Sequence, residues 1–182
     1  QLMENLATDP AVLKMYARHY KTGEPIPDEM IAKLEKSASF GQGFATTEYL
    51  ASSILDMEYH TQTKPITGKA TDFERQAMEK AGLIAAITPR HSSTHFGHIF
   101  SGGYSAGYYS YIWSGVLDND AFDQFKKTDL LKKEKAASFR SNILAKGDTE
   151  DPMILYKKFK GSEPSIEPLL RKRGLESQKK KS

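Results

Sequence analysis

Hydrophobic positions recur at helical spacing along most of the chain, whereas no strand-like alternation of apolar and polar residues runs beyond a few positions. The clearest helix start is the Asp9-Pro10 pair, because aspartate caps a helix and proline suits its first position. It predicts a helix from about Pro10 to Lys21. The same spacing predicts further helices at Pro27 to Phe40, Ala45 to His60, Thr71 to Ala81, Leu130 to Ala145, after Asp151-Pro152, and Ile166 to Arg173.

The expected fold class is therefore all-α. We expect one helical domain over residues 1–175 and a disordered basic tail over residues 176–182. The stretch from Ile84 to His91 is short and apolar up to its proline, so we expect a buried connector there.

A row of tyrosines follows a double glycine in the second half of the chain. Successive residues of a helix turn by about 100°, so Tyr104, Tyr108 and Tyr111 would lie within about 60° of one another on a continuous helix. An apolar set would point the other way and anchor this helix in a core: Tyr109, Ile112, Trp113 and Val116.

Gly102 and Gly103 precede this predicted helix and allow backbone conformations and close approaches that a side chain would forbid. Together with His98, they fit one mobile wall of an active site. The same tyrosine spacing also fits a half-buried packing surface whose hydroxyl groups reach water, and the spacing alone does not choose between the two.

Three of the five histidines have i, i+4, i+7 spacing, which on a helix would bring His91, His95 and His98 together for zinc. A proline precedes them and Gly97 interrupts them, and no acidic residue follows until after Tyr111. The His-Glu-x-x-His motif and the phosphate-binding loop are missing from the sequence. We therefore assign no metal ligand within this chain.

Composition excludes other classes of protein. Hydrophobic residues make up 38% and charged residues 27%, and no apolar run approaches the ~20 residues that cross a bilayer, so no membrane partner is expected. The net charge is +3, but the segment from Arg171 to Ser182 carries +5, which leaves −2 for the rest. Nucleic acid is thus not an expected partner. The lack of cysteine excludes disulfides and thiol catalysis.

The segment His98–Trp113, HIFSGGYSAGYYSYIW, closely resembles the tyrosine-loop segment of the thimet oligopeptidase family of zinc metallopeptidases. The likeness is closest to the bacterial peptidyl-dipeptidase, or dipeptidyl carboxypeptidase, branch. Three further phrases resemble the C-terminal region of the same family: HYKTGEP at 19–25, FATTEYL at 44–50 and GSEPSIEPLL at 161–170. The resemblance covers residues 1–175.

This resemblance implies that the chain is the C-terminal helical part of a larger, neurolysin-like α-helical peptidase. In that family zinc is held by a His-Glu-x-x-His helix and a further glutamate, all of which we expect upstream of Gln1. The implied cofactor is therefore zinc in the full-length enzyme, and the implied partners are short peptide substrates and the N-terminal remainder of the same polypeptide. We expect a cytoplasmic location and leave the periplasm open.

The resemblance also implies roles for individual residues. His98 resembles the histidine that contacts the substrate backbone near the scissile bond, and Tyr111 resembles the tyrosine that stabilises the tetrahedral oxyanion. The resemblance implies that Tyr104 is a further hydrogen-bonding wall, and we expect it to be catalytic. The expected substrate-binding residues are Tyr108, Gly102 and Gly103.

Five residues separate His98 from Tyr104, which resembles the peptidyl-dipeptidase branch and implies release of C-terminal dipeptides. Two alternatives stay open: an oligopeptidase A-like endopeptidase of the same family, and a non-catalytic helical domain that binds peptides on its tyrosine face.

Because the implied zinc ligands and general base lie outside residues 1–182, we predict that this polypeptide alone has no peptidase activity and binds no stoichiometric zinc. Both properties can be measured with purified chain, a blocked tripeptide and metal analysis. Hydrolysis that a chelator abolishes would contradict the prediction.

Overall fold

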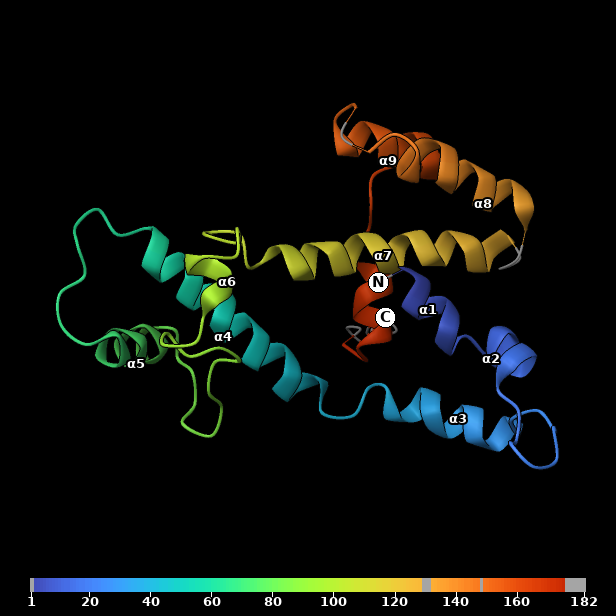
Figure 1. Cartoon of the computed structure of the whole chain (residues 1–182), viewed down its shortest axis with the longest axis horizontal. Helices are drawn as coiled ribbons and strands as arrows, with labels where there is room; N and C mark the ends of the chain where they lie inside the picture. Colours follow the sequence, from blue (N-terminus) through green and yellow to red (C-terminus); the bar gives the residue numbers. More distant parts are fainter. Residues whose placement is uncertain (1, 129–131, 148, 176–182) are drawn as a thin grey trace, which may run out of the picture. The chain divides into compact units, whose positions relative to one another are not determined.

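The computed structural model describes residues 2–128, 132–147 and 149–175, and it confirms the all-α class. Within these ranges no residue belongs to a β-strand. The helices, coloured along the chain in Figure 1, are α1 (Leu2–Thr8), α2 (Pro10–Tyr16), α3 (Asp28–Ser37), α4 (Gln42–His60), α5 (Ala70–Lys80), α6 (Gly97–Phe100), α7 (Ser110–Thr128), α8 (Lys133–Phe139), α9 (Pro152–Lys160) and α10 (Glu167–Lys172). A π-helical turn, Arg140–Leu144, continues α8. The predicted basic tail at 176–182 lies outside the described residues.

The described helices contain no segment both long and apolar enough to span a membrane. Most predicted helices are present with shifted ends. The helix predicted from Pro10 to Lys21 ends at Tyr16, because the backbone of Ala17 is extended there. The chain then turns back, and His19 N–H donates to the Glu24 carbonyl at 2.8 Å. Hydrogen bonds of this turn replace those that a longer helix would have made.

The chain divides into two compact units, one formed by residues 1–40 and 114–182 and the other by residues 41–113. We call them the outer-segment unit and the central unit. Helix α7 begins in the central unit and continues into the outer-segment unit. Each unit has its own cluster of buried side chains.

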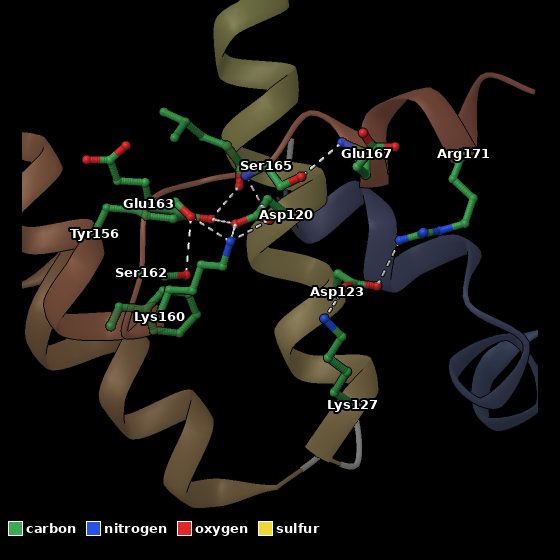
Figure 2. A network of polar contacts seen from close by, with 12 residues as sticks. Asp120, Asp123, Lys127, Tyr156, Lys160, Ser162, Glu163, Ser165, Glu167 and Arg171 are labelled. Carbon is green, nitrogen blue, oxygen red and sulfur yellow. Dashed lines mark hydrogen bonds and ion pairs between the residues drawn. The ribbon is translucent and has the colours of Figure 1, made fainter. Parts of the chain in front are cut away.

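In the outer-segment unit, Asp120 of α7 is 2% exposed and forms the centre of the polar network in Figure 2. Its carboxylate accepts hydrogen bonds from the Tyr156 hydroxyl at 2.5 Å and from Lys160 Nζ at 2.8 Å, both on α9. It also accepts one from the Ser165 backbone N–H at 3.1 Å. Asp120 thus ties α9 and the turn after it to α7, beside a cluster of aromatic side chains around Phe159.

In the central unit, α4 supplies the centre of the core. Leu55 is fully buried and packs in one cluster with Met78 of α5, Ile99 of α6 and Phe96. Along α4, however, the buried positions include polar residues (Ser52, Ser53 and Asp56), whereas Leu50, Ile54 and Met57 are 39–41% exposed. Helix α4 therefore directs a strip of polar side chains into the core of the central unit.

The connector from Ile84 to His91 was expected to be buried, and this prediction is wrong. Ile84 is 63% exposed, and no residue of the stretch is fully buried. Its tie to α4 is polar: Arg90 N–H donates to the Glu48 carbonyl at 3.3 Å, and His91 N–H donates to the Ser52 hydroxyl at 3.2 Å.

We predict that Asp120→Asn lowers the stability of the outer-segment unit by about 3 kcal/mol, because it leaves the Lys160 ammonium largely buried without its carboxylate. The measurement is the unfolding midpoint in denaturant. Asp123→Asn is the matched control on the same helix, since its partners Lys127 and Arg171 are more than half exposed and such pairs contribute less than about 1 kcal/mol. Equal losses from both substitutions would contradict the prediction.

Candidate active site

The tyrosine segment differs from its prediction, because α7 begins only at Ser110. Tyr104 and Tyr108 precede the helix in a series of turns, so a continuous helix from Tyr104 is wrong. Ala106 adopts the left-handed conformation, with φ of 54°, which no residue inside an α-helix has. We call residues 104–109 the tyrosine turn.

The three phenol rings nevertheless lie together. The ring centroid of Tyr111 is 5.3 Å from that of Tyr104, which stacks on it, and 5.2 Å from that of Tyr108, which meets it edge-on. The ring of His98 lies 6.0 Å from Tyr104 and 5.7 Å from Tyr108. The structure thus brings together all four ring-bearing residues that the sequence analysis selected.

Asp56 of α4 determines the backbone course of the tyrosine turn. Its carboxylate is fully buried and accepts hydrogen bonds from the backbone N–H groups of Ala106 and Tyr108, each at 2.9 Å. His60, one helical turn later, places Nδ1 2.8 Å from the same carboxylate. The bond to the Ala106 N–H supports the left-handed conformation, which costs free energy for any residue other than glycine.

Tyr49, also on α4, fastens the end of the tyrosine turn. Its hydroxyl donates to the Tyr108 carbonyl at 2.7 Å and accepts from the Ile112 N–H at 3.2 Å, in the first turn of α7. Its ring stacks on Tyr108 with centroids 5.5 Å apart. Both the start of α7 and the position of Tyr108 therefore depend on α4.

The double glycine makes the tight turn between α6 and the tyrosine turn. A Cβ atom on Gly102 would lie 2.9 Å from both the Cα atom and the carbonyl oxygen of His98, so only glycine fits. Gly103 has φ of 80°, in the region that favours glycine. The His98 carbonyl accepts from the Tyr104 N–H at 3.0 Å, which closes this turn and keeps His98 beside the phenols.

His98 lies among aromatic rings rather than in a metal site. The ring of His91 is 4.7 Å from it, whereas His95 is exposed and its Nδ1 contacts the Thr94 hydroxyl at 2.9 Å. Burial and the neighbouring His98 hold the pKa of His91 below its usual value. Within the described ranges, no group of three or more histidine, cysteine, aspartate or glutamate residues could hold a metal ion.

The pKa values of two of the phenols are raised. The hydrogen bond with the Tyr104 hydroxyl, together with burial, raises the pKa of Tyr111 to about 12. Burial likewise raises the pKa of Tyr108. A phenol with a raised pKa keeps its proton and remains a hydrogen-bond donor. The cluster can therefore stabilise negative charge on an oxygen, but it supplies neither a nucleophile nor a strong base.

Two residues that shape this cluster, Asp56 and Tyr49, were missed by the sequence analysis, and His91 was considered there only with His95 and His98 as a zinc site. A sequence signal was available for Asp56, because it is an acidic residue between two apolar residues, Leu55 and Met57, of a predicted helix. No sequence signal indicates that its partners are backbone N–H groups 50 and 52 residues away.

The sequence of this chain is similar to those of known peptidases. The sequence model of peptidase family M3 matches residues 1–175. Dipeptidyl carboxypeptidase of Escherichia coli is 38% identical over 96% of this chain, and oligopeptidase A of Escherichia coli is 36% identical over 96%. A probable cytosolic oligopeptidase A of Arabidopsis thaliana is 38% identical over 96%. The chain spans 26% of the length of each of these relatives.

We predict that Gly102→Ala destabilises the central unit by about 1–3 kcal/mol, because the new methyl group would overlap the His98 backbone. Gly97→Ala is the control, since its methyl group would meet only the Ser101 hydroxyl at 3.6 Å, an ordinary contact. Unfolding midpoints of the two variants in calorimetry provide the test. Unfolding midpoints equal to that of the wild type in both variants would contradict a close approach at Gly102.

Proposed function

This chain belongs to peptidase family M3, and we propose that it supplies the substrate-contacting and oxyanion-stabilising side of a zinc peptidase active site. We further propose that the full-length protein cleaves short peptides and releases C-terminal dipeptides. The observation that carries the proposal is the convergence of His98, Tyr104, Tyr108 and Tyr111 in one cluster of rings.

The proposed chemistry follows from the protonation of the cluster. Addition of water to a peptide carbonyl puts negative charge on its oxygen, and a neutral phenol can donate a hydrogen bond to that oxygen. Tyr111 keeps its proton because its pKa is raised to about 12 by the hydrogen bond with Tyr104 and by burial. When the oxyanion forms, the Tyr111 hydroxyl would exchange its bond with Tyr104 for one to the substrate.

The remaining cluster residues have binding roles in this proposal. His98 is half-buried beside the phenols and has ring nitrogens suited to hydrogen bonding with a peptide backbone. Tyr108 is 4% exposed, so its ring serves mainly as a packed wall. Gly102 and Gly103 belong to the proposed substrate-binding wall: a Cβ atom on Gly103 would meet open space, whereas Gly102 allows the close approach to the His98 backbone.

Zinc belongs to the proposal only for the full-length protein. Within the described part of the chain, no group of three or more histidine, aspartate or glutamate residues could hold zinc. We propose that the metal ligands and the base that activates water lie in the remainder of the polypeptide.

The choice between dipeptide release and internal cleavage rests on the residue spacing between His98 and Tyr104. Relatives named dipeptidyl carboxypeptidase and oligopeptidase A are 38% and 36% identical, a difference too small to decide. Product masses from a peptide with a free C-terminus separate the two: successive losses of two residues support dipeptide release, and internal fragments support the endopeptidase.

In the full-length enzyme we predict that Tyr111→Phe lowers kcat about 10²–10³-fold, because one oxyanion donor is lost in the transition state. KM should change much less, since the bound substrate carries no such charge. Tyr109→Phe is the matched control: it removes a neighbouring hydroxyl from a ring that is 54% exposed. Steady-state kinetics on one peptide measure both variants, and wild-type turnover in Tyr111→Phe would refute the oxyanion role.

A further inference from the structure

We infer that Asp56 is a positioning residue for this site, and that it acts by holding the backbone of the tyrosine turn, with His60 as its third partner. The kinetic part of this inference rests on the proposed function, whereas its structural part does not. Asp56 is not one of the phenol or histidine donors, and it meets the turn only through backbone N–H groups.

The two oxygens of the Asp56 carboxylate bind separate backbone groups of the tyrosine turn, and we call this set of contacts the clamp. Oδ1 accepts from the Ala106 N–H and Oδ2 from the Tyr108 N–H, so the two oxygens hold backbone groups two residues apart. His60 Nδ1 lies 2.8 Å from Oδ1 and 2.9 Å from the Asp56 carbonyl oxygen. Both neighbours of this nitrogen are acceptors, so it carries the hydrogen and donates it.

The clamp holds a backbone conformation that would otherwise be disfavoured. Ala106 has a positive φ of 54° without being glycine, and such a residue persists only where its surroundings impose it. Ala106 is exposed, so packing of its side chain does not impose this φ. The hydrogen bond from its N–H to a fully buried carboxylate does.

The hold of Asp56 on the backbone of the tyrosine turn affects the phenol rings through Tyr108. Its N–H donates to Asp56 and its carbonyl accepts from the Tyr49 hydroxyl, so both polar backbone groups of this residue are bonded to side chains of α4. Its ring lies edge-on to Tyr111. Release of the turn would let the rings separate, and the Tyr111 hydroxyl would lose its fixed position.

Asp56→Asn in the full-length enzyme tests this inference, because asparagine keeps the shape of the side chain but replaces one acceptor oxygen with a donor NH₂ group. One of the two backbone N–H groups is then left facing another donor. We expect kcat to fall at least about tenfold with KM changed less than about threefold, since the loss is in oriented groups rather than in binding.

Hydrogen exchange of peptides that span residues 104–109 gives a second readout, which requires no catalysis. We expect faster exchange in Asp56→Asn than in the wild type. The matched control is Glu58→Gln, which removes a carboxylate from the same helix that pairs with Lys80 rather than with the tyrosine turn. It should leave both kcat and the exchange of this segment unchanged.

A double-mutant cycle separates positioning from a general loss of structure. If Asp56 acts through Tyr111, Asp56→Asn costs much less in a Tyr111→Phe background than in the wild type. Fully multiplicative losses in kcat, or wild-type exchange and kcat in Asp56→Asn, overturn the inference. Should Asp56→Asn fail to fold, His60→Gln replaces it, with smaller changes of the same sign expected and wild-type values in both readouts overturning the inference.

The outcomes also distinguish this inference from the proposed function. Wild-type kcat in Tyr111→Phe refutes the oxyanion role, and the exchange measurement then decides the role of Asp56 alone. A low kcat in Tyr111→Phe with unchanged kcat and exchange in Asp56→Asn leaves the proposed function standing and refutes the positioning role.

Discussion

The carboxylate of Asp56 is the interaction on which the candidate site depends. Burying a charge is costly unless hydrogen bonds satisfy it, and here two backbone N–H groups and an imidazole do so. This requirement works in both directions. The turn needs the acid to hold Ala106 at its positive φ, and the fully buried acid needs the backbone N–H groups of the turn as hydrogen-bond donors.

The ring cluster shows how a site can prepare donors without any strongly charged group. Each phenol lies against other rings; the hydrogen bond with Tyr104, together with burial, raises the pKa of Tyr111, and burial raises that of Tyr108. A neutral donor attracts a developing oxyanion but does not bind a resting carbonyl equally strongly. In the proposed function, such an arrangement would favour the transition state over the ground state, which is the condition for catalysis.

The sequence predicted the fold class and most helices well, because capping residues and helical periodicity are local signals. The three phenol rings that it grouped on one face do lie together, but for a different reason: Tyr104, Tyr108 and Tyr111 converge through a turn before α7, not through the spacing of one helix. The sequence also predicted where α4 lies along the chain, but not which face of this helix is buried. Ile54 is apolar yet 40% exposed, whereas partners distant in sequence hold Asp56 and Ser52 in buried positions.

The dependence of the tyrosine turn on Asp56 has a consequence for engineering this fold. A designer who transplanted residues 98–113 into another helical scaffold would carry over every ring and both glycines, yet would leave behind the acid and the Tyr49 hydroxyl that hold them. The smallest portable module is therefore discontinuous: it needs α4 and the segment from α6 to the start of α7 together. A recombinant of two related proteins with its crossover between these two segments should keep the ring cluster only when α4 of one parent matches the tyrosine segment of the other.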